Sequence, residues 1–187
     1  MHHPFKPTRE QLLGARGRSV PDLIAPGLKV LFCGINPGLY TAAVGHHFAR
    51  PGNRFWPALH QAGFTPRLLS PFEERELLRH GYGIVNIVQR ATARADELTT
   101  EELAGGGREF VEKVRVFRPK FCAILGLSAY RAAFSHPGAL PGPSPEKIAG
   151  ISYAWVLPSP SGINASYQMK DLVGLLKALS GAVERQS

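Results

Sequence analysis

Short apolar segments alternate with longer segments of helical pattern along most of this 187-residue chain. The strand-type segments are residues 28–33, 83–88, 121–125 and 152–157. The helical patterns are residues 54–62, 72–80, 99–117, 127–134 and a leucine-rich segment near the C-terminus. Strands that alternate with helices are joined by right-handed crossovers. The order therefore predicts an α/β three-layer sandwich with a central, mainly parallel four-stranded sheet.

Prolines and glycines mark the segments that we expect to be irregular. Residues 1–27 carry four prolines and no sustained period, which predicts an N-terminal arm or lead-in before a domain at 28–187. The segments 34–52 and 136–145 are predicted to be loops.

The helix predicted at 99–117 contains three consecutive glycines at 105–107. Thr99 and Glu102 have the spacing of a capping box, and Pro119 ends the pattern. Each glycine weakens a helix by about 1 kcal/mol relative to alanine. The three glycines indicate either a break between two short helices or a place where another element packs against bare backbone.

The carboxyl ends of parallel strands meet at one edge of a sheet, where α/β proteins bind ligands. We therefore expect four loops to converge there, namely those after Cys33, Val88, Leu125 and Leu157. The first loop is Gly34-Ile35-Asn36-Pro37-Gly38. Its proline and glycines restrict the backbone tightly, so the Asn36 amide is aimed rather than mobile.

The loop after the last strand is Pro158-Ser159-Pro160-Ser161-Gly162-Ile163-Asn164. Its serine hydroxyls and backbone N–H groups suit phosphate oxygens, Gly162 permits close approach, and the apolar Ile163 suits insertion into a base stack. Taken alone, each of the two loops is also typical of an ordinary turn or a stiff connector. Together, at the ends of buried strands of one sheet, they favour a site.

The charge balance predicts a polyanionic partner, because 22 lysines and arginines stand against 14 acidic residues, a formal net charge of +8. Two cysteines are too few for a disulfide scaffold or a four-thiolate zinc site. The longest apolar stretch, 121–127, is far shorter than the ~18 residues of a membrane span. The first residues also lack the apolar core of a signal peptide. We therefore expect a cytoplasmic protein that does not contact membranes.

Five motifs appear in a specific order: Gly34-Ile35-Asn36-Pro37-Gly38, Phe48, Asn53-Arg54-Phe55-Trp56, Gly106-Gly107-Arg108 and Pro158-Ser159-Pro160-Ser161-Gly162. With these motifs the chain resembles the mismatch-specific uracil/thymine DNA glycosylase (MUG/TDG) family of the uracil-DNA glycosylase superfamily, over roughly residues 28–179. The resemblance implies a uracil-DNA glycosylase-like fold and a base excision repair enzyme. Such an enzyme flips uracil out of double-stranded DNA, above all from G·U mismatches, and hydrolyses its N-glycosidic bond. It implies no metal, no organic cofactor and a monomer.

The resemblance also implies roles for individual residues. Asn36 corresponds to the asparagine that positions the attacking water, and Phe48 to the ring that stacks on the flipped base. The remaining implied contacts fall into two groups, namely Ile35, Thr41 and Ser159 for the base, and Ser161, Gly162, Ile163 and Asn164 for the DNA. Ser159 stands where the family often has asparagine, which implies a weaker hydrogen-bond donor to the developing anion on the base. Ala165 stands where some relatives have arginine, which implies weaker binding to the DNA duplex.

Asp96 is a second candidate catalytic residue, and this hypothesis comes from its location in the loop after the second strand rather than from the family pattern. An asparagine amide can orient a water but cannot take its proton, whereas a carboxylate can do both. The alternative is that Asp96 and Glu97 merely favour the start of the next helix.

Neither loop motif contains a lysine that could form a Schiff base, which predicts a monofunctional enzyme. The alternative function is a non-enzymatic basic α/β module that binds nucleic acid, in which the stiff loops only contact phosphates.

Overall fold

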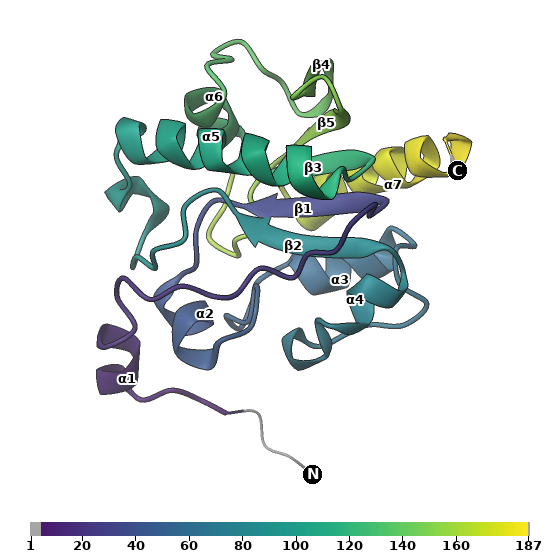
Figure 1. Cartoon of the computed structure of the whole chain (residues 1–187). Helices are drawn as coiled ribbons and strands as arrows, with labels where there is room; N and C mark the ends of the chain where they lie inside the picture. The colour runs from purple at the N-terminus through teal and green to yellow at the C-terminus, as the bar shows by residue number, and fades with distance from the viewer. Residues whose placement is uncertain (1–4, 187) are drawn as a thin grey trace.

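The computed structural model describes residues 5–186, and within them one sheet of five strands has the order β2-β1-β3-β5-β4 (Figure 1). Its strands are β1 (Val30–Gly34), β2 (Tyr82–Asn86), β3 (Phe121–Leu125), β4 (Gly142–Ile148) and β5 (Ser152–Leu157). The first, second, third and fifth are parallel, and β4 pairs antiparallel with β5. The predicted α/β class with a mainly parallel sheet is confirmed.

Helices cover both faces of this sheet. They are α1 (Arg9–Leu13), α2 (Leu39–Val44), α3 (Phe55–Gln61), α4 (Glu76–Arg79), α5 (Thr100–Phe117), α6 (Leu127–Ala133) and α7 (Met169–Arg185), with 3-10 turns η1 (Pro71–Glu73) and η2 (Ala95–Glu97). In Figure 1, α5 and α6 lie on one side of the sheet, and α3 and α4 on the other. None of the helices within residues 5–186 combines the length and the apolar character that crossing a membrane requires.

The core has two halves because side chains alternate across a strand. Phe32 packs with α3 and α7 on one face, and Leu31 packs with α5 and α6 on the other. Every residue of β1 and β3 is buried. Burial on both faces explains why these strands are continuous apolar runs rather than alternating patterns.

The strand count predicted from the sequence was wrong by one, because β4 occupies part of the segment 136–145 expected to be a loop. Pro143 and Pro145 are acceptable there because β4 is an edge strand that pairs only with β5. The segment 34–52 is likewise not all loop, since it contains the six-residue helix α2. The helix predicted at 72–80 is shorter and is preceded by a 3-10 turn.

The glycines at 105–107 lie inside the uninterrupted helix α5, so the predicted break is wrong and the close-packing alternative is correct. A Cβ atom on Gly106 would lie 2.2 Å from the carbonyl oxygen of Ile87. One on Gly107 would lie 2.3 Å from the carbonyl oxygen of Ala133. Helix α5 therefore contacts the end of β2 and helix α6 through bare backbone.

The N-terminal segment packs against the sheet along its β2 edge. Leu23 exchanges two backbone hydrogen bonds of 2.8 Å with Ile84 of β2. Further back, Gly17 donates to the Ala91 carbonyl at 2.9 Å, and the Ala91 N–H donates to the Arg18 carbonyl at 2.8 Å. Residues 1–4 of the predicted lead-in lie outside the described residues, and the domain boundary proposed at residue 28 stays a prediction.

Candidate active site

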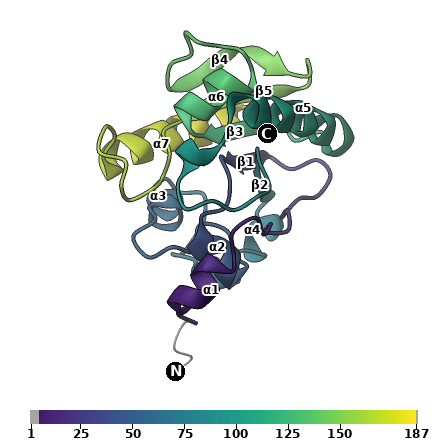
Figure 2. The same ribbon diagram turned by 90° about the vertical axis from the view of Figure 1, so that its left-hand side faces the viewer.

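The loops after β1, β2 and β5 surround one cavity of about 380 Å³ at the carboxyl end of the parallel strands. The arrowheads of β1 and β2 point toward this edge in Figure 1, and Figure 2 views the molecule from that side. Nine of the ten residues singled out from the sequence line the cavity: Ile35, Asn36, Thr41, Phe48, Asp96, Ser159, Ser161, Ile163 and Asn164. The tenth, Gly162, lies between two of them in the same loop. Loops more than 100 residues apart therefore meet as expected.

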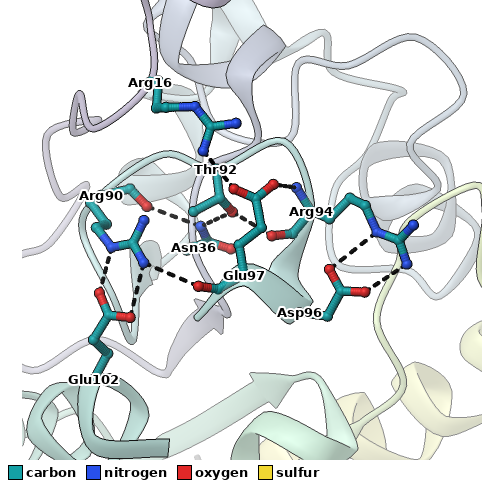
Figure 3. A network of polar contacts seen from close by, with 8 residues as sticks. All are labelled: Arg16, Asn36, Arg90, Thr92, Arg94, Asp96, Glu97 and Glu102. Atoms are coloured by element: carbon teal, nitrogen blue, oxygen red, sulfur yellow. Dashed lines mark hydrogen bonds and ion pairs between the residues drawn. The ribbon is translucent and has the colours of Figure 1, made fainter. Parts of the chain in front are cut away.

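The amide of Asn36 is held by two hydrogen bonds from its nitrogen (Figure 3). Nδ2 donates to the carbonyl of Arg90 at 2.9 Å and to Oγ1 of Thr92 at 2.8 Å. Thr92 is buried, and its hydroxyl donates onward to the carbonyl of Arg94 at 2.7 Å. Because both amide protons are used, the side chain is fixed, and Oδ1, which no described residue contacts by a hydrogen bond, remains as an acceptor for water.

Phe48 lines the cavity, and its ring is held in place by a neighbouring aromatic ring. Its ring stacks on Phe55, with 4.2 Å between the ring centroids and 25° between the planes. Its backbone has φ 54°, the left-handed region that few residues other than glycine adopt. Strain of this kind costs of the order of 1 kcal/mol and tends to be retained at functional sites.

Asn86 is a site residue that the sequence analysis missed. It ends β2, lines the cavity and is 5% exposed, and its Nδ2 has no hydrogen-bond partner among the described residues. A Cβ atom on Gly34 would lie 2.6 Å from Asn86 Oδ1, so the glycine is what allows this amide to sit beside β1. The sequence offered only a polar residue inside the apolar segment predicted as a strand at 83–88. The structure ends β2 at Asn86, which places this amide at the ligand-binding edge.

Asp96 lines the mouth of the cavity from the 3-10 turn η2. Its side chain is 62% exposed, and both carboxylate oxygens accept hydrogen bonds from Arg94, at 3.1 and 2.6 Å. The alternative, that Asp96 and Glu97 favour the start of the next helix, stays open, because both lie in the 3-10 turn η2 just before α5. Asp96 is placed at the cavity and is engaged by a cation there.

The loop after β5, residues 158–167, is braced by Arg54. The Arg54 guanidinium donates to the carbonyls of Tyr167 at 2.6 Å and Ser161 at 2.7 Å, and it makes longer contacts with two further carbonyls of the loop. A Cβ on Gly162 would lie 2.7 Å from the Gly52 carbonyl oxygen, so the loop and the segment before α3 touch through backbone. Ile163 is 74% exposed at the tip of the loop.

Four arginines, Arg50, Arg54, Arg90 and Arg94, lie in or beside the loops that surround the cavity, and the structure separates them by their partners. Three are already bound within the protein: Arg54 to backbone carbonyls, Arg90 to Glu102 and Arg94 to Asp96. Arg50 lines the cavity, and no side chain described in residues 5–186 forms an ion pair or hydrogen bond with its guanidinium. It is therefore the arginine of this group that can bind an incoming anion without giving up a partner.

His47 contributes a buried wall of the cavity. It is 1% exposed, its Nε2 lies 3.0 Å from the Pro21 carbonyl, and Trp56 Nε1 donates to the His47 carbonyl at 3.2 Å. Burial lowers the pKa of His47 from 6.5, and the nearby Glu74 carboxylate only partly opposes this shift. The neutral ring then donates to Pro21 through Nε2, which links the cavity wall to the N-terminal segment.

Comparisons with known proteins agree with this geometry. A family model for the uracil DNA glycosylase superfamily matches residues 21–180. The fold is similar to the solution NMR structure of a proposed uracil DNA glycosylase from Methanosarcina acetivorans, with a TM-score of 0.57 and 17% sequence identity. That similarity covers 88% of this chain and 98% of the other. The structural likeness establishes the fold, and the family match extends over the elements that surround the cavity.

Proposed function

The chain belongs to the uracil DNA glycosylase superfamily, and we propose that it is a monofunctional enzyme of the MUG/TDG family that excises uracil from double-stranded DNA. Its preferred substrate is uracil opposite guanine, and related damaged pyrimidines are further candidates. A base cannot be excised while it is stacked, and extrusion costs a few kcal/mol, least at a mismatch. Weak pairing in G·U therefore contributes to selectivity.

One observation carries the proposal: a single cavity brings together the fixed amide of Asn36, the ring of Phe48 and the buried amide of Asn86, whose Nδ2 has no partner among residues 5–186. Phe48 gives an extruded pyrimidine an aromatic face on which to stack. The Asn86 amide carries both a donor and an acceptor, which match the O4 and N3–H groups of uracil. A buried amide without a partner costs stability, and a bound base would satisfy it.

The chemistry follows from the charges that develop as the bond between C1′ and N1 breaks. The sugar becomes cationic and the base anionic, so donors must face the base oxygens and an oriented water must face the sugar. Besides Asn86, we assign base contacts to Ile35, Thr41 and Ser159, and the water to Asn36 Oδ1. The carboxylate of Asp96 is our candidate for accepting the proton of that water. These steps use protein groups and water, and need no metal or cofactor.

The loop 158–167 is our candidate for the DNA contact. Its exposed tip, Ile163, would fill the space that the extruded base leaves in the stack, and Ser161, Gly162 and Asn164 would lie along the backbone. The net charge of +8 supports binding to a polyanion. We propose that a single copy of the chain binds DNA inside the cell.

A defined set of oligonucleotides tests the proposal. The substrates are duplexes with uracil opposite guanine or adenine, the matching single strand, and duplexes with thymine opposite guanine. We expect release of free base from the G·U duplex first, measured in single turnover. Binding to all duplexes without release of any base would instead establish the rival function, a non-enzymatic module that binds nucleic acid.

A further inference from the structure

The loop between β2 and α5 determines the position of the Asn36 amide. Both partners of Asn36 Nδ2, the Arg90 carbonyl and Thr92 Oγ1, belong to this loop (Figure 3). Thr92 is in turn tied to the Arg94 carbonyl. Any shift of residues 90–94 would therefore move the Asn36 side chain, although Asn36 itself lies 54 residues earlier in the chain.

The Arg90 end of this loop is fixed by Glu102, in the first turn of α5. Arg90 Nε and Nη2 each donate to one carboxylate oxygen of Glu102, the second at 2.9 Å, and Nη2 also donates to the Glu97 carbonyl at 3.2 Å. Two parallel N–H···O bonds fix the planar guanidinium as a single bond could not. The hydrogen bond from Arg90 is the main cause that lowers the pKa of Glu102 to about 2, so this carboxylate is charged at neutral pH.

The pair has a geometry that capping of α5 does not require. Glu102 also accepts the Thr99 N–H at 2.9 Å, and the Thr99 hydroxyl accepts the Glu102 N–H at 3.1 Å, which together form the capping box. That box is complete without Arg90. The contact with Arg90 instead joins the long helix to the residue whose own carbonyl holds Asn36.

We propose that Glu102 is a positioning residue for catalysis. It fixes Arg90, and the Arg90 carbonyl in turn sets the direction in which Asn36 presents Oδ1 to the attacking water. This inference rests on the proposed function. Glu102 is not among the residues that line the cavity, so we expect it to affect the geometry of the reacting water and not DNA binding. A displacement of about 1 Å in such a group can lower a rate about 100-fold.

Glu102→Gln is the informative variant. Glutamine at this position still accepts the Thr99 N–H and keeps the capping box, but it lacks the charge and the second oxygen that hold Arg90. We expect the single-turnover rate on saturating G·U duplex to fall about 10-fold, with the dissociation constant for the duplex unchanged. The control is Glu112→Gln, which breaks the exposed ion pair with Arg115 on the same helix, and we expect it to leave both quantities unchanged.

A double-mutant cycle tests the route through Asn36. If Glu102 acts through Asn36, then Glu102→Gln lowers the rate in the wild-type background but changes the residual rate of Asn36→Ala less than twofold. An equal loss in both backgrounds would show that Glu102 acts by another route, and no loss in the wild-type background would show that the contact does not position the amide. Either result overturns the inference.

The side-chain amide of Asn36 provides a readout that does not depend on activity. Its NMR signals are identified by their loss in Asn36→Ala, and its two hydrogen bonds predict slow exchange of these protons with solvent. Glu102→Gln should accelerate this exchange about 10-fold, whereas Glu112→Gln should not. If no uracil substrate is cleaved, the proposed function fails. Unchanged exchange in Glu102→Gln refutes the positioning role separately.

Discussion

Asn36 and Asp96 face the same cavity but can act on a water molecule in different ways. The amide oxygen of Asn36 can only accept a hydrogen bond, whereas the carboxylate of Asp96 can also take a proton. Asn36 is fixed through its nitrogen, and Asp96 is engaged by Arg94. The geometry therefore supports orientation of water by Asn36. The contribution of each of the two residues to the excision rate can be measured separately.

We predict that Asn36→Ala lowers the single-turnover excision rate about 100-fold, because the water loses its orienting acceptor. Asp96→Ala should cause a loss of about 100-fold if its carboxylate accepts the proton of that water. Glu101→Ala, which removes an exposed carboxylate in the first turn of α5, is the control and should leave the rate unchanged. A wild-type rate in Asp96→Ala removes Asp96 from the mechanism.

Arg50 is expected to contact a DNA phosphate, because its guanidinium has no ion-pair partner among residues 5–186 and lines the cavity. Arg50→Ala should weaken binding to every duplex, whatever the sequence. The slope of log K against log salt concentration should fall by about 1, since one fewer counterion is released. Arg115→Ala, at the far end of α5, should leave the slope unchanged. Fluorescence anisotropy over a series of salt concentrations makes the comparison.

Among the helices, α5 is the one whose sequence conflicts most with its conformation, since three glycines lie within its first half. Close packing on Ile87 and Ala133 explains Gly106 and Gly107, because no side chain fits at either contact, whereas a Cβ on Gly105 would meet only the Arg108 side chain at 3.7 Å. The same bare contact places the first turn of α5, which carries Glu102, beside the loop that holds Asn36. The packing of α5 against the end of β2 and against α6 thus helps to determine the position of the loop that holds Asn36.

Gly106→Ala is predicted to destabilise the protein by about 3 kcal/mol, because its methyl group would meet the Ile87 carbonyl oxygen in a rigid part of the backbone. Gly174→Ala, in α7, is the matched control. A Cβ at Gly174 meets nothing within 4 Å, so alanine should stabilise this helix by about 0.5–1 kcal/mol. Urea unfolding of both variants measures the difference, and equal stabilities would contradict the packing argument.

For the molecule as a whole, His47 links pH to stability. Burial lowers the pKa of His47 in the folded chain below its ordinary 6.5, so the unfolded chain binds this proton more tightly. The stability that His47 contributes is complete above about pH 6.5 and is lost as the pH falls through the lower, folded value. We predict that the free energy of unfolding decreases between pH 7 and pH 5.

His47→Gln should make this dependence shallower, because glutamine can still donate to the Pro21 carbonyl but does not titrate. His136→Gln, after α6, serves as the control, since that ring is part of the surface contact with Glu146. Denaturant unfolding at a series of pH values gives the slopes. Identical slopes for the wild type and His47→Gln would show that another group governs the pH dependence.

The local sequence pattern was sufficient to predict the parallel strands, helix α5 and the two loops that carry Asn36 and Ser159. Apolar runs and turn residues determine such elements through near neighbours in the chain. It was insufficient for β4, since Pro143 and Pro145 are tolerated only because that strand lies at an edge. The role of Asn86 was also hidden. Its amide becomes significant only when loops distant in sequence close over it and leave it unpartnered.

The strand-like contact between residues 17–18 and Ala91 has a consequence for how the chain can be shortened. Two backbone hydrogen bonds join the N-terminal segment to the residue immediately before Thr92, whose hydroxyl holds Asn36. A truncated protein that begins at Leu28 would contain the residues of all five strands, but it would lose this lateral support and the bridge between Leu23 and Ile84. We therefore expect the chain needed to hold the Asn36 amide to begin before residue 17, well ahead of the first strand of the sheet.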